Sequence, residues 1–191
     1  MELLEAINGR RSVREYTDQA VDDAVLRELI NAAVQAPSAI NQQPWSFAVV
    51  KDRALLAQIS DKAKAHLLKA SLGVPAQRFH DMLSDPKFHV FYHAPVLIVI
   101  SAAEPSDWIV EDCALAAQNL MLAAYAAGLG SCWIGFAQAW LGTSDGKSAL
   151  GLPASYVPVA PIIVGHPQRQ PAPVPRKKPN IRWIESSGGK L

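Results

Sequence analysis

Hydrophobic residues recur at helical spacing over residues 22–36. The positions that share one face of such a helix are Val25, Leu26, Leu29, Ile30, Ala33 and Val34. Two acidic residues, Asp22 and Asp23, precede this stripe, where negative charge favours the start of a helix. The pattern therefore predicts a helix that begins at Asp22 and ends near Ala36-Pro37.

Residues 107–127 predict the strongest helix of the chain. The segment is rich in alanine, which favours helices and allows close packing, and its larger apolar residues include Leu115, Leu120 and Met121. Gly128 follows as a natural stop. We expect this helix to lie at the centre of the core, with those three side chains packed there.

Three short apolar runs predict strands, at Phe47–Val50, Pro95–Ile100 and Val157–Val164. The last two are apolar at almost every position, as expected for strands that are covered on both faces. Helical and strand segments alternate irregularly along the chain. This order favours a mixed sheet flanked by helices over a helical bundle or an eight-fold barrel.

The remaining segments have less regular patterns. Residues 2–8, 53–69 and 76–84 read as helices, and the segment around Gly73-Val74-Pro75 reads as a break and as the most mobile part of the chain. We found no internal repeat that would indicate a solenoid or propeller.

The C-terminal part is rich in proline. Residues 167–179 cannot form a regular helix, so we expect an extended path that could wrap a partner, followed by a strand-like piece at Ile181–Ile184. We predict one domain over residues 1–185, in which 167–185 form an extended C-terminal arm. Residues 186–191 read as a disordered tail.

Composition narrows the class of protein. Half of the 191 residues are hydrophobic and 18% are charged, which excludes a disordered chain and suggests that a subunit interface buries part of the apolar surface. The net charge of +1 gives no overall attraction to nucleic acid or to an anionic membrane. No segment reaches the ~20 apolar residues of a membrane span, and no secretory signal pattern is present, so we expect a cytoplasmic protein.

The cysteines and histidines suggest no metal site. Cys113 and Cys132 lack metal-ligand spacing, and a buried apolar thiol is the expectation for each. The histidines are scattered, and no nucleophile-and-base set stands out. A protein this poor in reactive side chains needs a cofactor to supply its chemistry if it is an enzyme.

Four segments are candidate binding sites. The first contains Arg10, Arg11, Ser12 and Arg14, which offer many donors and therefore suit a phosphate or a carboxylate. In an extended segment Arg10, Ser12 and Arg14 share one side while Arg11 faces elsewhere. A solvated charged patch is the alternative interpretation of the same residues.

The other candidates are a polar loop, a glycine-rich segment and a basic cluster. The loop Pro37–Trp45 carries hydroxyl and amide groups that could bind the edge of a pyrimidine-like ring, although an ordinary turn has the same composition. Gly128–Phe136 could bring backbone N–H groups close to a flat ligand, but it lacks the third glycine of a dinucleotide fingerprint. Arg176, Lys177 and Lys178 could bind an anion or simply keep the chain soluble.

The order and spacing of these segments resemble the nitroreductase family of flavoproteins. Residues 10–16 are similar to the family's basic-Arg-Ser-x-Arg-x-Tyr/Phe segment, and residues 36–45 to its Pro-Ser-x-x-Asn-x-Gln-Pro-Trp loop. Residues 128–136 match its Gly-Leu-Gly-x-x-Trp-Ile-Gly stretch, and residues 151–153 and 161–167 resemble its closing strand. Residues 67–93 contain no matching stretch, which leaves the electron acceptor unassigned.

The resemblance implies an α+β fold, with a mixed, mainly antiparallel sheet flanked by helices, in a domain-entwined homodimer with FMN at the subunit interface. The FMN-binding residues that it implies are Arg10, Arg11, Ser12, Arg14, Pro37, Ser38, Ala39, Asn41, Trp133, Ile134, Gly135, Arg176 and Lys177. The arginine segment and the basic tail would hold the phosphate and ribityl chain. The loop would reach the flavin from the other subunit, and the backbone near Trp133 would lie close to the flavin N5 atom.

The resemblance also implies a reaction. NADH or NADPH would reduce the flavin and leave, and a small planar acceptor such as a nitroaromatic compound or a quinone would then take its place, in a ping-pong mechanism that requires no catalytic side chain. Other redox reactions on the same scaffold remain open, namely reductive dehalogenation, dehydrogenation of a small molecule and flavin breakdown. A non-enzymatic protein that binds a polyanion through its two basic clusters is the third hypothesis.

Overall fold

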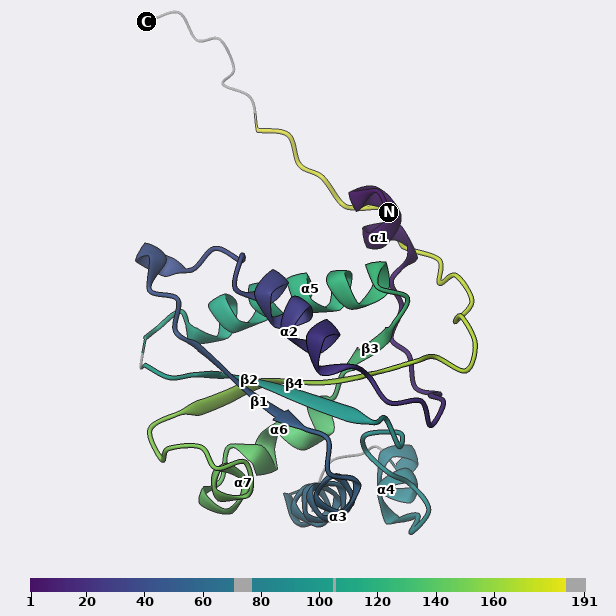
Figure 1. Cartoon of the computed structure of the whole chain (residues 1–191), viewed down its shortest axis with the longest axis vertical. Coiled ribbons are helices and arrows are strands. Elements are labelled where there is room, and N and C mark those ends of the chain that lie inside the picture. The colour runs from purple at the N-terminus through teal and green to yellow at the C-terminus, as the bar shows by residue number, and fades with distance from the viewer. Residues whose placement is uncertain (71–76, 105, 185–191) are drawn as a thin grey trace, which may run out of the picture.

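The computed structural model describes residues 1–70, 77–104 and 106–184 (Figure 1). These residues form a four-stranded antiparallel sheet with the order β1-β2-β4-β3. The strands are β1 (Trp45–Val50), β2 (Val96–Ala102), β3 (Gly130–Trp133) and β4 (Val157–Gly165). The predicted α+β class and mainly antiparallel sheet are confirmed.

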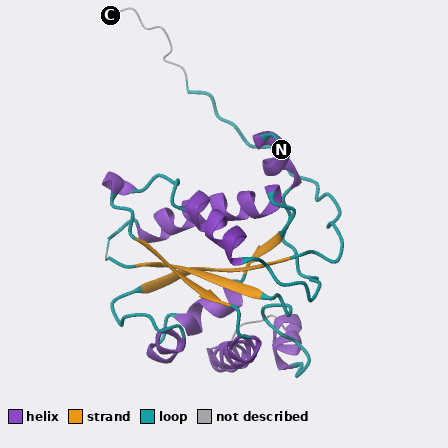
Figure 2. Ribbon diagram, in the orientation of Figure 1, coloured by secondary structure: helices purple, strands orange, loops and turns teal. Residues whose placement is uncertain are grey.

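Helices cover both faces of the sheet, which gives three layers (Figure 2). One face carries α2 (Asp23–Ala33) and α5 (Ile109–Ala126). The other carries α3 (Arg53–Ala70), α4 (Gln77–Ser84), α6 (Gly135–Leu141) and α7 (Ser144–Ala149). The first helix, α1 (Leu3–Gly9), lies beside the C-terminal end of α5.

The two central strands are apolar at almost every position because both of their faces are covered. In β2, Ile98 and Ile100 belong to the core beneath α2 and α5, whereas Leu97 and Val99 belong to the core above α3 and α6. Every residue of β2 is buried. The predicted strands at 47–50, 95–100 and 157–164 are confirmed as β1, β2 and β4, except that β2 begins one residue later, at Val96.

Local sequence explains where α2 begins. The Asp22 side chain accepts a hydrogen bond of 2.7 Å from the Ala24 N–H, which caps the helix as its position predicted. The helix ends at Ala33, and a turn carries the chain on to Pro37. The predicted helix is therefore confirmed, with an end that is three residues early.

The long helix α5 packs through small residues, as predicted. Its buried stripe runs through Cys113, Ala116, Ala117, Leu120, Met121 and Ala124. The expectation for Leu115 is wrong, because this side chain is 45% exposed. It lies off the stripe that meets the sheet, so the single chain does not bury it.

The strand predicted at Ile181–Ile184 is wrong. Within the described chain these residues have no strand partner, and they lie on an arm that leaves the body of the molecule beyond α1 (Figure 1). A strand needs a neighbour for its N–H and C=O groups, and the apolar pattern alone does not supply one. The predicted break near Gly73-Val74-Pro75 and the predicted tail at 186–191 lie outside the described residues.

Truncation of a fully buried side chain should destabilise the fold strongly. Phe91 is completely buried in the core above α3 and α6. We expect Phe91→Ala to lower the free energy of unfolding by about 3–5 kcal/mol, as large cavities do. Phe79 is 53% exposed, and Phe79→Ala should cost less than about 1.5 kcal/mol. Equal losses in urea denaturation would contradict this packing.

Candidate functional site

The Arg10–Arg14 segment is extended and runs alongside β3. The Val13 N–H donates to the Ser131 carbonyl over 3.0 Å, and Ser12 forms an isolated bridge with Ser131. Val13 is buried, whereas Ser12 and Arg14 are exposed and Arg10 is half-buried. The alternation supports the prediction that Ser12 and Arg14 share the side away from the core.

Arg11 has a different role within the described chain. Its Nη1 donates to the Asn8 carbonyl over 2.7 Å and to the Arg10 carbonyl over 2.8 Å. The Asn8 carbonyl belongs to the last turn of α1 and the Arg10 carbonyl follows the helix, so the guanidinium holds the turn between α1 and the extended segment. Arg11 therefore faces away from the position that Ser12 and Arg14 share, as the alternation predicted.

Arg14 lies between two cavities. One has a volume of about 290 Å³ and is lined by Arg14, Tyr92 and residues 132–136. The other has about 500 Å³ and is lined by residues 12–15 and 169–172. The Arg14 Cζ atom lies 5.7 Å from the centre of the Tyr92 ring. The structure thus brings together two predicted groups, the arginine segment and the backbone of residues 133–135.

Of the backbone N–H groups at residues 133–135, that of Gly135 is the best candidate to donate a hydrogen bond to a ligand. The Ile134 N–H already donates to the Pro161 carbonyl over 2.8 Å. Gly135 begins α6, whose N-terminus has no side-chain cap, and an added Cβ at Gly135 would meet no described atom within 4 Å. Since the first N–H groups of a helix lack intrahelical partners, Gly135 is the donor that can face a ligand.

Cys132 stands beside the same cavity and is 1% exposed. Burial raises the pKa of the Cys132 thiol, an effect that Arg14, Ser12 and Arg10 partly oppose. The group therefore stays a neutral thiol near pH 7, and the positive charge of the arginines is not cancelled by a thiolate. The prediction that both cysteines are buried is confirmed.

The loop Pro37–Trp45 is attached to the start of α5. It contains a short 3-10 helix at Ala39–Asn41, and its Ala39 N–H donates to Oδ1 of Asp112 near the start of α5, over 2.9 Å. Pro37 and Asn41 are exposed, and Ser38 and Ala39 are half-buried.

The residue directly before the arginine segment packs on the opposite end of α5. An added Cβ at this residue, Gly9, would lie 2.1 Å from the Tyr125 hydroxyl. Asp112 and Tyr125 are 125 − 112 = 13 positions apart on α5, which corresponds to about 20 Å along a helix. One chain therefore does not bring the loop together with Arg10–Arg14 (Figure 1).

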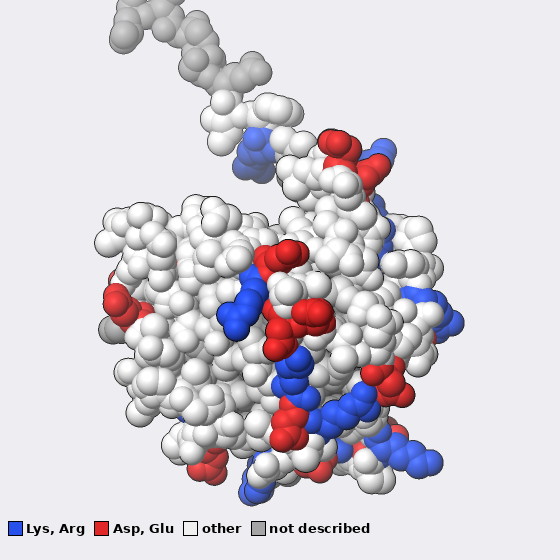
Figure 3. Space-filling model, in the orientation of Figure 1, with Lys and Arg blue, Asp and Glu red and all other residues white. Residues whose placement is uncertain are grey.

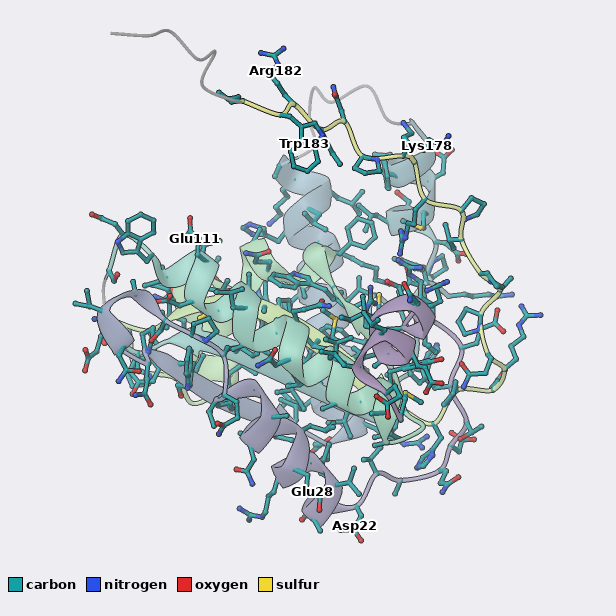
Figure 4. The ribbon with its side chains drawn as sticks, turned by 90° about the horizontal axis from the view of Figure 1, so that it is seen from above. Asp22, Glu28, Glu111, Lys178, Arg182 and Trp183 are labelled. Atoms are coloured by element: carbon teal, nitrogen blue, oxygen red, sulfur yellow. The ribbon has the colours of Figure 1, made fainter. Side chains whose placement is uncertain are left out.

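Arg176 and Lys177 are exposed on the C-terminal arm. Figure 4 shows Lys178, Arg182 and Trp183 on the same arm. None of residues 176–178 lines either of the two cavities beside Arg14.

Aromatic side chains form a wall beside the cavity that Arg14 and Tyr92 line, and no motif in the sequence predicted it. Phe88 and Phe136 meet edge to face with ring centres 6.3 Å apart, and Phe88 meets Tyr92 in the same way at 5.7 Å. Phe79 of α4 adds a further edge contact with Phe136 at 6.1 Å. Only the density of aromatic residues between 79 and 92 could have pointed to this wall.

The described residues show neither a metal cluster nor a membrane helix. Within residues 1–70, 77–104 and 106–184, no three His, Cys, Asp or Glu side chains gather in a way that could hold a metal ion. In the same residues, no helix is both long and apolar enough to span a membrane.

Comparison with known proteins identifies relatives along most of the chain. The model of the Nitroreductase family matches residues 7–166. A protein of Methanothermobacter thermautotrophicus named "Putative NADH dehydrogenase/NAD(P)H nitroreductase" is 31% identical over 176 residues, which cover 90% of this chain and 80% of the relative. The 5,6-dimethylbenzimidazole synthase of Rhodospirillum rubrum is 29% identical over 178 residues, covering 87% and 82%.

A solved structure has the same fold. The nitroreductase with bound FMN from Desulfitobacterium hafniense superimposes with a TM-score of 0.82 and 26% sequence identity, over 97% of this chain and all of that one. The resemblance found in the motifs is confirmed by these matches.

The turn that presents Tyr92 should be sensitive to acid. Burial, and secondarily the neighbouring His93, lowers the pKa of His89 from its ordinary 6.5 to about 4. The unfolded chain therefore takes up this proton first as the pH falls. We expect His89 to destabilise the fold progressively as the pH falls from about 6.5 to about 4, and to have no such effect above that window.

Thermal unfolding across this pH range tests the assignment. His89→Gln should abolish this part of the acid sensitivity, whereas the control His80→Gln, at an exposed position of α4, should retain it. The assignment fails if the His89 variant loses stability with pH as steeply as the parent protein.

Proposed function

This chain belongs to the nitroreductase family, and we propose that it transfers electrons from NADH or NADPH to small planar acceptors such as nitroaromatics or quinones. It is an FMN-dependent oxidoreductase. The single observation that carries the proposal is the cavity lined by Arg14, Tyr92 and residues 132–136. In this cavity, a guanidinium group that can bind an anion lies beside apolar and aromatic side chains.

The residues around this cavity fit FMN. Among the described residues, no carboxylate pairs with Arg10 or Arg14, so both guanidinium groups remain available for a phosphate. Ser12 adds a hydroxyl on the side of Arg14. Guanidinium groups bind phosphate oxygens with charge-assisted hydrogen bonds, which are among the strongest in proteins.

The chain's own groups would orient the reactants and keep water out. When bound, FMN supplies the chemistry, since its ring accepts a hydride and passes electrons on. Arg10, Ser12 and Arg14 would hold the polar chain of the cofactor, and the Gly135 N–H would stabilise the ring edge that gains electron density on reduction. Phe136 and Tyr92 would exclude water from one side. Catalysis would then rest on the positions of the reactants, with no side chain acting as an acid or base.

A second subunit would complete the site. In one chain, Ser38 and Asn41 lie about 20 Å along α5 from the arginine segment. In the proposed dimer, they would instead reach the cavity of the neighbouring copy. The loop has features of an interface, because Ile40 is 96% exposed. Further exposed apolar side chains, on α1, before α5 and on α5, are Leu3, Leu4, Ile7, Trp108, Val110 and Leu115. Such patches are typical of subunit contacts.

The C-terminal arm would extend the same interface. Ile181, Trp183 and Ile184 are 57%, 80% and 89% exposed in the single chain. We propose that the arm lies against the partner subunit and that Arg176 and Lys177 reach the partner's cofactor phosphate. This arrangement would cover the apolar side chains and add positive charge near the phosphate.

One observation favours a second reaction on the same scaffold. The relative from Rhodospirillum rubrum, similar over most of its length, is named for the synthesis of 5,6-dimethylbenzimidazole.

A polyanion-binding protein is less well supported, because positive and negative side chains alternate on the face shown in Figure 3. Several charged side chains of the described chain also neutralise one another, as in the ion pairs Lys51–Asp23 and Arg53–Asp18.

The visible absorption spectrum of the purified protein tests the proposal. We expect flavin bands that bleach when NADH or NADPH is added without oxygen and that return with menadione or nitrofurazone. Arg14→Gln should weaken FMN binding by roughly 10–100-fold, because it removes a charged donor. The matched control Arg27→Gln, on the exposed side of α2, should bind FMN normally.

The alternatives give different results. Loss of the flavin itself under oxygen, with no turnover of added acceptors, would favour flavin breakdown. A colourless protein that takes up no FMN, and that binds a polyanion in a steeply salt-dependent way, would overturn the proposal.

A further inference from the structure

Asp112 is a buried carboxylate in the first turn of α5. The residue is 3% exposed, and its Oδ1 accepts the hydrogen bond from Ala39. Its Oδ2 is buried and has no hydrogen-bond partner in the part of the chain that the structure describes. Burial of a charged group is costly unless it is compensated, and the start of a helix compensates it only in part. The position of Asp112 therefore calls for a reason beyond packing.

The loop that Asp112 holds is strained. Ile40, Asn41 and Gln43 have φ angles of 47°, 57° and 51°, in the left-handed region. This region is unfavourable above all for a β-branched residue such as Ile40, whose side chain is too exposed to be forced there by packing in its own chain. Strained conformations persist only where neighbouring contacts over-determine them, and they cluster at functional sites.

Two kinds of contact restrain the loop. Within it, the Gln43 N–H donates to the Ser38 hydroxyl over 2.9 Å, and the Asn41 N–H donates to the Ser38 carbonyl over 3.0 Å. These bonds shape the loop but do not place it. The Ala39–Asp112 hydrogen bond joins the start of the loop to α5, at a sequence separation of 73 residues. The far end of the loop is held by the segment after β2, where the Gln42 amide donates to Glu104 over 3.4 Å and the Ala103 N–H donates to the Pro44 carbonyl over 2.6 Å. Asp112 is thus the restraint on the half of the loop that contains Ser38 and Ala39.

We propose that Asp112 is a positioning residue for the flavin. Its hydrogen bond with the Ala39 N–H sets the positions of Ser38 and Asn41, and these positions decide how the two side chains contact the FMN ring in the partner subunit. This inference rests on the proposed function, because it takes the loop to be the part of the site that the second chain supplies. Asp112 itself does not touch the cofactor. It fixes the angle and distance at which the loop approaches the ring edge.

Two substitutions remove the hydrogen bond from opposite sides. Asp112→Ala removes the acceptor. Ala39→Pro removes the donor, and the backbone tolerates it, because Ala39 opens a 3-10 helix and Ser38 before it is extended, with φ −137° and ψ 156°. Asp112→Asn keeps an acceptor oxygen and serves as the rescue variant. Glu111→Ala removes the exposed neighbouring acid of the same helical turn and is the matched control (Figure 4).

The first readout needs no cofactor. In FMN-free protein, amide hydrogen exchange at Ala39 and in the loop should accelerate in Asp112→Ala and remain near the parent rate in Asp112→Asn and Glu111→Ala. Unchanged exchange in Asp112→Ala would overturn the inference while leaving the proposed function intact.

The second readout uses the holoprotein and separates positioning from stability. In Asp112→Ala and in Ala39→Pro, the flavin that remains bound should show a shifted midpoint potential and an altered visible spectrum, with FMN affinity lower by roughly tenfold. Asp112→Asn should lie close to the parent protein in both properties.

A fall in melting temperature with an unchanged potential and spectrum would mean that Asp112 is merely structural, and the inference would be wrong. Failure of the parent protein itself to bind FMN would overturn the proposed function, and the inference with it. The parent spectrum therefore distinguishes the two failures.

Discussion

The structure depends on the packing of α5 against the sheet. A stripe of small residues, including Ala116, Ala117 and Ala124, lets the helix lie close to β2 and β4, and their burial fixes it there. Such a helix is a rigid rod of 18 residues, with a length of about 27 Å. The polar loop that follows α2 is tied near the start of α5, and Gly9, directly before the arginine segment, packs against its end. The helix therefore keeps the loop and the arginine segment, the two parts of the proposed site, apart within one chain.

This constraint links features that are otherwise unrelated. In the proposed dimer, a second copy would complete the site that the rigid helix divides, and it would cover the apolar surface left open on α1, on the outer side of α5 and on the arm. It would also give a reason for the strained and exposed loop, which would then contact the partner subunit. In the same proposal, Arg14 and Gly135 line the cavity on one chain, and the loop of the other chain completes it.

Much of this was predictable from sequence, where the signal was local. Four elements have a period or a composition that is compatible with few other secondary structures. They are α2 with its apolar stripe, the alanine-rich α5, and the strands β2 and β4, which are apolar on both faces. The arginine segment alternates as an extended strand should, with Val13 buried and Ser12 and Arg14 exposed. In contrast, β3 is only four residues long and contains glycine and serine, so no period could indicate it. The strand expected at Ile181–Ile184 shows that an apolar pattern does not form a strand without a neighbour. Tyr92 contacts Arg14, and Asp112 accepts a hydrogen bond from Ala39. Both contacts join segments that are far apart in the sequence, so the spacing of residues along the chain could not predict them.

The central claim is that each site is built from two chains, and a mixed dimer tests it most directly. One chain carries Arg14→Gln with an intact loop, and the other carries Asn41→Leu with an intact arginine segment. The two chains are given different affinity tags and coexpressed, and the mixed dimer is isolated. The account predicts that each variant alone binds FMN weakly, whereas the mixed dimer regains one intact site and binds about one FMN per dimer, because a two-fold interface pairs each segment with the other chain. A mixed dimer that binds FMN no better than the two variants alone would contradict it.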